Sequence, residues 1–581
     1  KSGPFHKLSG WLLGRFALLA IRKRMRTEAE EREREALPEL APLEAAKVYA
    51  SQSPAFFARS RSAALLTLLN IWIALAWGAN IPIPGSLSGD VRTAALVSLT
   101  VLLTVMLMGL DVLSVGVLSA VGGRPGWETL LSIGCVGSVI DCVYVAVSKN
   151  TAAALPPCAL CSLAVTLALR GSWYRCRSLK AGFLALHRSA NAYSVSEETL
   201  SGRRDKYAVK SRRSRAGFIR RSEENDVCEE AGQRFSLYIL ALLLLSTAVF
   251  AIITRDASRL SHGFAVLSAF CACSPALFAL PMLMAPSAER LGKTGCAVSG
   301  WQGIERLGKC SRLIVTDSDL FPEGNTAFNA IFVSDGQDTE KVISYTASLI
   351  AAAESDLSRL FADLMERSGG RMRAVAAFEG SRNGAKGLID GVEVMVGNAG
   401  YMYFRGIKPD PKLVGENRLF TAFGGELVGA FGVEYTPDPK VRAALQTLNK
   451  SGKQPYFAVR DFNIDAQLVE RLFRCRCDNF EFPEENAPLL PEGSEDGTEV
   501  SAIIGAGGLD RLVDLFESSR CLRRYGLIPR ALSLTAVGLG LLLGLWCCIR
   551  GDWAAVSAAR LLLYQVFWLL LSLAMGLDPR L

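Results

Sequence analysis

Long apolar runs alternate with short charged segments over most of this chain. A helix needs about 20 mostly apolar residues to cross a bilayer core about 30 Å thick. About eight runs approach that length, which predicts a polytopic α-helical membrane protein with about eight transmembrane helices. The predicted spans are Ala63–Trp77 (extending toward Ile83), Ala94–Val121, Leu130–Val147, Ala152–Leu169, Leu237–Ile253, Phe264–Met284, Ala531–Ile549 and Ala554–Met575.

A different pattern occupies residues 286–528, between the sixth and seventh apolar runs. Short apolar segments alternate there with amphipathic ones, which is typical of strands and helices alternating around a parallel sheet. The pattern therefore predicts an inserted α/β region. Its predicted strands are Arg312–Thr316, Val392–Val396, Glu426–Gly432 and Ser501–Ile504, and its predicted helices are Leu349–Met365 and Lys440–Leu448.

The charges lie between the apolar runs and predict the orientation of the chain. Half of the residues (50%) are hydrophobic and only 21% are charged, with a net charge of +8. Lys and Arg are concentrated in residues 1–60 and 171–234, which the positive-inside rule places in the cytoplasm. The insertion and both termini are then cytoplasmic too, in what we take to be the plasma membrane. No basic patch interleaved with aromatic residues accompanies the charge, so the lipid bilayer, and not nucleic acid, is the expected partner.

The positions of the cysteines and histidines indicate which metal ions the chain could bind. The chain has 15 cysteines, mostly in apolar runs or in the predicted cytoplasmic part, where a disulfide framework is not expected. Its three histidines are scattered, so no histidine-based metal site is expected. Cys271 and Cys273 are candidate soft ligands for Cu⁺ or Zn²⁺, and Cys158-x-x-Cys161 lies on one helix face. The alternative is that these cysteines are small buried residues of the helix packing.

Four features resemble the heavy-metal (CPx-type) P-type ATPases. The order of apolar pairs, cytoplasmic loop and large α/β insertion matches that family. Cys271–Pro275, reading CACSP, is similar to the CPC signature of its ion-binding helix. Gly300–Gly324 resembles the segment that carries the phosphorylated DKTGT motif, and Ile389–Gly391 with Val394–Asn398 resembles a run of the nucleotide-binding domain.

The resemblance implies a haloacid-dehalogenase-like core with an inserted nucleotide-binding-like domain. Loop 171–234 stands where the family has its actuator domain, but it is about half the usual length and has no TGE sequence. We expect it to lack a compact β-rich domain. The implied units are 1–60, a cytoplasmic segment; 61–170, four transmembrane helices; 171–234, the actuator remnant; 235–285, a transmembrane pair; 286–325 and 421–528, the phosphorylation-type domain; 326–420, the nucleotide-binding-like domain; and 529–581, the last transmembrane pair.

The resemblance also locates the catalytic positions, where this chain departs from the family. A gap-free match puts Thr316 at the phosphorylated aspartate, and a threonine cannot form an acyl phosphate. A one-residue slip instead makes Asp317 the nucleophile and Asp319 its acid/base partner, as in the D-x-D of related phosphatases. A third interpretation is a polar turn after a strand.

The other motifs of the family are also altered. The Mg²⁺-binding GDGxND corresponds to residues 505–510, where Ala506 replaces a carboxylate and only Asp510 is kept. Alanine supplies none of the oxygen ligands that Mg²⁺ requires. The TGD motif is replaced by a segment ending in Asp461. Asp317, Asp319, Asp461 and Asp510 still form a candidate acidic cluster, with no lysine expected beside the strand end.

Nucleotide binding depends on glycines that let the backbone approach the ligand closely. Of the family's G-x-G loop only Gly384 or Gly387 fits, although Gly397 and Asn398 match the V-x-V-G-N run. The sequence therefore favours an inactive P-type ATPase scaffold with a structural, regulatory or partner-binding role in the membrane. The first alternative is a divergent metal-transporting ATPase that uses ATP, Mg²⁺ and Asp317, and the second is a membrane-tethered phosphatase.

Two expectations concern the sheet. Strand Arg312–Val315 should be central, and it should lie beside Ser501–Ile504, because ligands of such folds gather at the carboxyl ends of neighbouring parallel strands.

Overall fold

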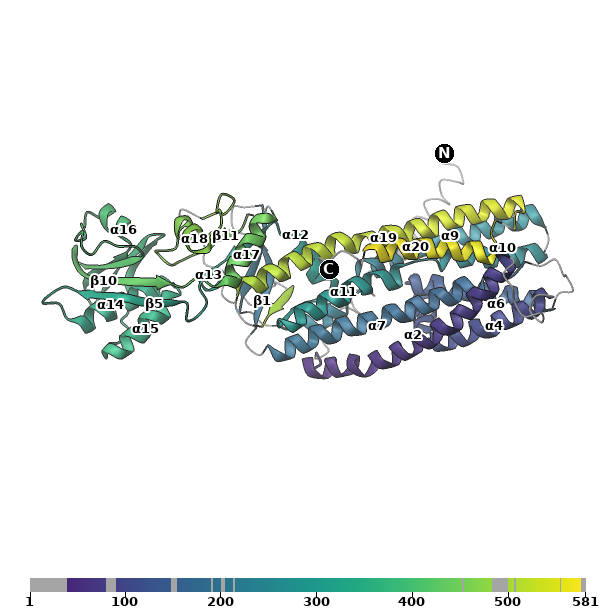
Figure 1. The fold of residues 1–581 in the computed structure, drawn as a ribbon, viewed down its shortest axis with the longest axis horizontal. Coiled ribbons are helices and arrows are strands. Elements are labelled where there is room, and N and C mark those ends of the chain that lie inside the picture. The colour runs from purple at the N-terminus through teal and green to yellow at the C-terminus, as the bar shows by residue number, and fades with distance from the viewer. Residues whose placement is uncertain are drawn as a thin grey trace, which may run out of the picture.

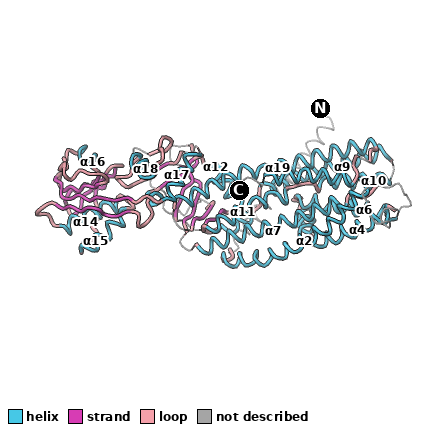
Figure 2. Tube along the Cα trace, in the orientation of Figure 1, coloured by secondary structure: helices cyan, strands magenta, loops and turns pink. Residues whose placement is uncertain are grey.

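The computed structural model describes residues 39–79, 90–147, 154–189, 192–199, 204–212, 215–255, 257–451, 454–482, 500–505, 508–553 and 555–575. Most of the predicted segment 1–60, as well as Ala506, lies outside these residues. The described chain forms three parts in a row (Figure 1). A helical bundle occupies one end, a mixed β-sheet with helices stands in the middle, and an antiparallel sheet domain forms the other end. Strands are confined to the half of the molecule away from the bundle (Figure 2).

The bundle consists of long apolar helices whose outward faces carry large exposed side chains such as Leu107 and Leu244. Six helical segments among the described residues are long and apolar enough to cross a membrane, and α5 and α20 are shorter apolar helices. The predicted fold class, a polytopic helical membrane protein with an inserted α/β region, is confirmed. The helices are α2 (Pro42–Ala79), α4 (Val91–Met108), α5 (Leu110–Val121), α6 (Trp127–Val147), α7 (Cys158–Arg188), α9 (Val227–Thr254), α10 (Ala257–Cys271), α11 (Ala276–Lys293), α19 (Leu509–Arg550) and α20 (Ala558–Met575).

Two of the predicted spans are not continuous helices. The span predicted over Ala94–Val121 breaks at Gly109 into α4 and α5. A Cβ on Gly109 would lie 2.5 Å from Cγ1 of Val165 on α7, so the small residue permits a close helix contact there. The span predicted over Phe264–Met284 breaks between α10 and α11. Pro275 precedes α11, and a proline has no N–H with which to continue the preceding helix.

The middle sheet has six strands in the order β11-β4-β2-β1-β12-β3. β11 and β2 flank β4 and run parallel to it, whereas β1 pairs antiparallel with both β2 and β12, and β12 with β3. The expectation that β4 lies beside β12 is wrong, because β1 and β2 separate them. The strands are β1 (Tyr193–Thr199), β2 (Lys206–Ser211), β3 (Cys296–Val298), β4 (Arg312–Val315), β11 (Tyr456–Phe457) and β12 (Ala502–Ile504).

The two strands that lie between β4 and β12, β1 and β2, come from loop 171–234. No compact β-rich domain was expected in this loop. The loop does form strands, but they belong to the middle sheet and not to a separate domain. Four consecutive residues of β2, Tyr207–Lys210, are buried, as expected for a strand covered on both faces. The shared sheet places the loop and the insertion on the same side of the bundle.

The far sheet is antiparallel throughout, in the order β5-β10-β9-β8-β7-β6. Figure 1 shows α14 and α15 on one side of it and α16 on the other. Because β9 and β10 belong to this sheet, the boundary expected between residues 420 and 421 falls inside β9. The strands are β5 (Thr326–Val333), β6 (Ala376–Ser381), β7 (Gly384–Ile389), β8 (Val392–Gly397), β9 (Arg418–Phe423) and β10 (Glu426–Tyr435).

The remaining helices cover the two sheets and connect them to the bundle. The single helix predicted over Leu349–Met365 is wrong: the segment contains the end of α14 and most of α15, separated by a turn in which Glu354 has a positive φ of 52°. These helices are α8 (Phe218–Glu223), α12 (Gly300–Lys309), α13 (Asp317–Leu320), α14 (Thr339–Ala352), α15 (Leu357–Ser368), α16 (Ala399–Phe404), α17 (Pro439–Lys450) and α18 (Ala466–Phe473).

Candidate functional site

The candidate site begins where β4 ends. Thr316 follows the strand and is the N-cap of α13, in a capping box with Asp319. The Thr316 hydroxyl donates to Oδ2 of Asp319 at 2.9 Å, and its backbone N–H donates to the same oxygen at 3.1 Å. This is the reciprocal arrangement by which a helix start satisfies its free N–H groups. The hydroxyl of Thr316 is therefore held in a hydrogen bond at the start of α13.

Asp317 is the first residue of α13, and its carboxylate faces the loop that follows β11. Its oxygens accept the backbone N–H of Arg460 at 3.0 Å and that of Asp461 at 3.1 Å. Burial raises the pKa of Asp317 well above its usual range, and the charges of Asp461 and Asp356 raise it further. A raised pKa disfavours the charged carboxylate, which is the form that acts as a nucleophile.

Asp461 lies beside Asp317 and is itself held by hydrogen bonds. The Tyr435 hydroxyl donates to its Oδ2 at 2.6 Å, and the backbone N–H of Asn463 donates to its Oδ1 at 3.0 Å. Burial raises the pKa of Asp461 to about 6, although these two hydrogen bonds lower it. The structure thus brings two of the predicted acidic residues together in a desolvated pair.

Asp319 is fully buried and forms an ion pair with Lys210. Lys210 is near the end of β2, and its Nζ also lies 4.8 Å from the centre of the Tyr193 ring on β1. The expectation of no lysine beside the strand end is wrong, because loop 171–234 supplies one from 109 positions away in the chain. The only sequence signal was a lysine that directly follows the apolar run Tyr207–Val209. With its oxygens bound to Lys210 and Thr316, Asp319 is not free to act as an acid or base.

Asp510 does not join this cluster. It is in the first turn of α19, which follows β12. Three strand spacings separate β12 from β4, or about 14 Å at roughly 4.8 Å each. In the described part of the chain, no group of three or more His, Cys, Asp or Glu residues is arranged to hold a metal ion. The predicted four-residue cluster is therefore reduced to the pair Asp317–Asp461, with Asp319 paired to Lys210.

The predicted nucleotide-binding residues lie in the far sheet and contact protein groups. A Cβ on Gly384 would lie 2.5 Å from the Tyr401 ring, and one on Gly397 would lie 2.6 Å from it. Asn398 caps α16 through its Oδ1, and its Nδ2 donates to the carbonyl of Phe462 at 3.0 Å. The absence of a side chain at these two glycines thus lets the Tyr401 ring pack directly against their backbone.

The third predicted glycine is packed in the same way. A Cβ on Gly387 would lie 2.6 Å from Val375 and 3.0 Å from Leu349, both apolar side chains. This position therefore serves the packing of β7 against its neighbours.

We expect Gly384→Ala to lower the free energy of unfolding of the far sheet by about 1–3 kcal/mol, the usual cost of overpacking. The added methyl group would meet the Tyr401 ring and the backbone oxygen of Val396. Gly400→Ala is the matched control, since its Cβ would meet only Asn398 Oδ1, at 3.4 Å. Hydrogen exchange of β7 and β8 in the full chain measures the effect. Equal protection in the two variants would contradict this packing.

The two cysteines predicted as soft ligands face different surroundings. Cys271 ends α10, belongs to an apolar cluster with Leu267 and Leu541, and its thiol donates to the Leu267 carbonyl at 3.6 Å. Cys273 lies in the break before α11 and belongs to the cluster formed by α6 and α7. They do not form a group of three or more ligands with any other described residue.

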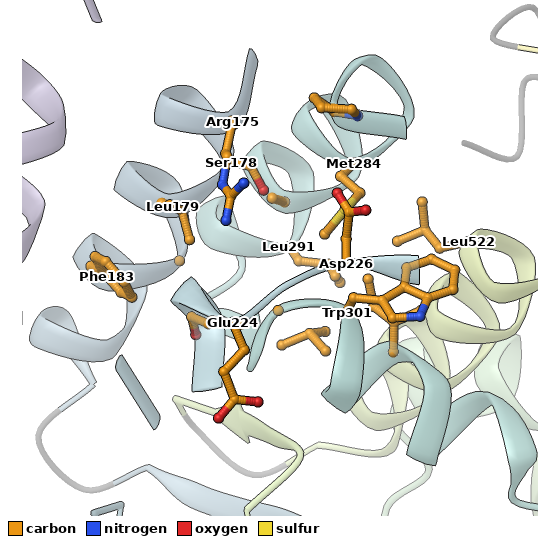
Figure 3. A pocket seen from close by; sticks show the side chains of 18 residues that line it. Arg175, Ser178, Leu179, Phe183, Glu224, Asp226, Met284, Leu291, Trp301 and Leu522 are labelled. Atoms are coloured by element: carbon orange, nitrogen blue, oxygen red, sulfur yellow. The ribbon is translucent and has the colours of Figure 1, made fainter. Parts of the chain in front are cut away.

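A cavity that the sequence did not indicate lies where α7, α11, α12 and α19 approach the start of α9 (Figure 3). Leu291, Trp301 and Leu522 give it an apolar wall. Arg175 and Asp226 lie at its edge, but both have partners: Arg175 pairs with Glu229, and Asp226 caps α9. It is separate from the acidic pair at the end of β4.

Sequence comparisons find relatives among metal-transport proteins. A copper-transporting P-type ATPase of Rhizobium leguminosarum bv. viciae is 27% identical over 317 residues, 52% of this chain and 36% of that protein. A silver exporting P-type ATPase of Salmonella typhimurium is 22% identical over 320 residues, 52% of this chain and 37% of that protein. The matches thus span less than two fifths of either relative. The chain matches no family model.

Among solved structures, the crystal structure of a zinc-transporting PIB-type ATPase in its E2.Pi state covers 89% of this chain and 99% of that one. It is 13% identical with a TM-score of 0.43, a likeness too distant to support a conclusion by itself.

Apolar helical segments and an inserted region with an acidic pair at the end of a parallel strand together define a polytopic helical membrane protein with an inserted α/β region. The sequence matches make the identification more specific. The chain is a divergent relative of the heavy-metal P-type ATPases.

Proposed function

We propose that this chain is a P-type ATPase-like scaffold that does not turn over ATP and that has a structural or regulatory role in the membrane. The plasma membrane is its proposed location, with both termini and the insertion in the cytoplasm. Its proposed partners are the lipid bilayer, another membrane protein and a soft metal ion.

The observation that carries the proposal is the position of the β1–β2 hairpin. It comes from the loop that stands where the family has its actuator, and it is hydrogen-bonded between β4 and β12. Moving it relative to the phosphorylation-type domain would break both ladders. It would also separate Lys210 from Asp319 and leave two charges buried without partners. A loop fixed in this way is suited to a static scaffold.

The residues at the end of β4 support the same conclusion. Aspartyl-phosphate chemistry requires a nucleophile, a Mg²⁺ ion held by carboxylates and a cation near the transferred phosphoryl group. By the gap-free match Thr316 stands at the family's nucleophile position, and Asp319 neutralises the nearby cation, Lys210. Asp510, the carboxylate kept from the Mg²⁺ motif, is three strands away.

The leading alternative is a divergent metal-transporting ATPase that uses Asp317, ATP and Mg²⁺. Its support is the place of Asp317 after a parallel strand, where two backbone N–H groups stabilise its charged form. The same placement would serve a membrane-tethered phosphatase.

We expect the purified full chain, incubated with labelled ATP and Mg²⁺, to form no acid-stable, hydroxylamine-labile phosphoprotein. The relative from Rhizobium leguminosarum bv. viciae, treated identically, is the positive control. Asp317→Asn should leave the result and the protein's biological role unchanged. Vanadate-sensitive ATPase activity that disappears in Asp317→Asn would establish the transporting alternative. Release of phosphate from a phosphorylated substrate, lost in the same variant, would establish the phosphatase.

A further inference from the structure

Arginines and aromatic rings gather where α2 and α7 pass from apolar to polar sequence. Arg61 precedes the apolar stretch of α2 that begins at Ala63, and Arg170 follows the apolar stretch of α7 that ends at Leu169. Figure 1 shows these two helices side by side. The residues that meet there, which we call the arginine–aromatic cluster, are Phe57, Arg61, Arg170, Trp173 and Tyr174.

Contacts between α2 and α7 place the two arginines at the same level. Three side-chain pairs fix the register of the helices, at 5.2 Å between ring centres and 2.9 Å for each of two hydrogen bonds: Phe57–Trp173, Thr67–Thr166 and Asn70–Ser162. Residue numbers rise along α2 as they fall along α7, so the helices are antiparallel. Both guanidiniums consequently lie near the Phe57 ring, with Cζ of Arg61 at 5.6 Å from its centre and Cζ of Arg170 at 5.2 Å.

Arg61 continues the stripe of α2 that faces lipid. Leu65, Leu68 and Trp72 are 71%, 60% and 37% exposed, and they follow Arg61 at intervals of four, three and four residues. This spacing puts all four side chains on one face of the helix. Large apolar side chains exposed on a membrane helix contact acyl chains. Arg61 is about 6 Å further along the axis than Leu65, which is the level of the lipid headgroups.

The two arginines of the cluster differ from their neighbours in charge compensation. The other arginines of α2 and α7 near this level pair with carboxylates: Arg59–Asp111, Arg175–Glu229 and Arg177–Glu289. Within the part of the chain that the structure describes, neither Arg61 nor Arg170 makes an ion pair or a hydrogen bond. The cluster therefore holds two positive charges that no protein carboxylate neutralises.

Aromatic rings hold Arg170 without using its hydrogen-bond donors. Its Cζ lies 3.9 Å from the centre of the Trp173 ring and 5.4 Å from that of Tyr174. A cation over a ring face is attracted by the π electrons. The N–H groups of a guanidinium lie in its own plane and form a fork that matches phosphate oxygens. The rings thus orient Arg170 and leave its donors available to an anion.

We propose that the arginine–aromatic cluster binds the headgroup of one anionic phospholipid. The phosphate group accepts hydrogen bonds from Arg61 and Arg170, since Arg–phosphate pairs are among the strongest charge-assisted hydrogen bonds. The rings of Trp173 and Tyr174 lie at the membrane–water interface, where such residues are enriched. One acyl chain then lies along the stripe that begins at Leu65.

The charge of the cluster selects an anionic lipid over a zwitterionic one. A zwitterionic headgroup brings its own cation, which the two arginines repel. In the proposed orientation this end of the bundle lies in the cytoplasmic leaflet, whose surface is anionic. The inference goes beyond the bilayer as a general partner, because it names one headgroup site. It rests on the proposed orientation only for the leaflet that supplies the lipid, and it is independent of ATP turnover.

The test is native mass spectrometry of the purified full chain in detergent, titrated with phosphatidylglycerol or with phosphatidylcholine of the same acyl chains. The unmodified chain should bind one phosphatidylglycerol more tightly than phosphatidylcholine. Each basic residue near an anionic surface contributes about fivefold in affinity, so Arg61→Gln/Arg170→Gln should bind phosphatidylglycerol about 25-fold more weakly.

The matched control removes the same charge from the same two helices. Lys47 and Arg188 are exposed residues of α2 and α7, about 20 Å or more along the helices from Arg61 and Arg170. Lys47→Gln/Arg188→Gln should therefore keep the affinity for phosphatidylglycerol. An equal loss in this control would show that net charge alone attracts the lipid, and would overturn the proposal.

Two measurements on the unmodified chain keep the test independent of how the variants fold. Glycerol phosphate at the concentration of the lipid should not displace phosphatidylglycerol, because it has no acyl chain to lie along the stripe from Leu65. Displacement by glycerol phosphate would identify a site for free phosphate groups instead of a lipid site. Equal affinity for phosphatidylglycerol and phosphatidylcholine would likewise contradict the proposal.

Discussion

Lys210→Met is expected to lower the free energy of unfolding of the middle sheet by about 3–5 kcal/mol, the cost of breaking a buried ion pair by removing one partner. Lys210 is 9% exposed and Asp319 is 0% exposed. Without the lysine, the carboxylate of Asp319 keeps its hydrogen bonds from Thr316 but has no compensating charge. Hydrogen exchange of β2 and β4 in the full chain, followed by mass spectrometry, measures the loss.

The same strand offers a matched control for this prediction. Lys206 pairs with Glu197, but its side chain is 49% exposed, and exposed pairs contribute only about 0–1 kcal/mol. Lys206→Met should therefore have little effect. The double variant Lys210→Met/Asp319→Asn removes both buried charges and should recover most of the stability. If Lys210→Met costs no more than Lys206→Met, the ion pair does not hold the hairpin in the sheet.

Asp461 is expected to lower the stability of the region around β11 by about 3 kcal/mol as the pH rises from about 4 to about 6, and Asp317, whose pKa is also raised, lowers it further in the same direction. The pKa of Asp461 is raised from 3.8 to about 6, a difference of about 2.2 units at 1.36 kcal/mol each. Because the folded state holds this proton more tightly than the unfolded state, the stabilisation is complete below pH 3.8 and lost above about 6. Hydrogen exchange of residues 456–464, corrected for intrinsic rates, measures this dependence.

Two variants test the assignment of that pH dependence to Asp461. Asp461→Asn removes the titrating group and also lowers the pKa of Asp317, because a neighbouring negative charge is gone. The slope between pH 4 and 6 should therefore become shallower, and the part due to Asp317 should remain, because burial is the largest cause of its raised pKa. Tyr435→Phe removes a hydrogen bond that lowers the pKa of Asp461, so the upper end of the pH window should move above 6. An unchanged slope in Asp461→Asn would show that another group is responsible.

The loop between α7 and α9 is built into the middle sheet through β1 and β2. The hairpin closes the space between β4 and β12, and its lysine is neutralised by a buried carboxylate. In the far domain, Tyr401 fills the space beside the glycines that resemble the family's nucleotide loop. Each of these contacts stabilises one conformation, as the proposed scaffold role requires.

Local sequence pattern determined the elements and the class of protein. The apolar runs predicted the helices of the bundle, and strands such as Val392–Val396 and Glu426–Gly432 were located within a few residues of β8 and β10. Hydrophobic periodicity is a property of neighbouring residues, so it can be read without knowing the fold. The cysteine motif and the Gly300–Gly324 segment gave the family, which the sequence matches confirm.

Only the tertiary structure decided which of these elements meet. Lys210 and Asp319 are 109 positions apart, and the pairing of β2 with β4 leaves no local pattern in either strand. The same holds for the close packing of Gly109 against Val165 of another helix, and for the contact between Cys142 of α6 and Cys158 of α7. Such contacts depend on the packing of segments distant in sequence, and that packing is fixed only when the whole chain has folded.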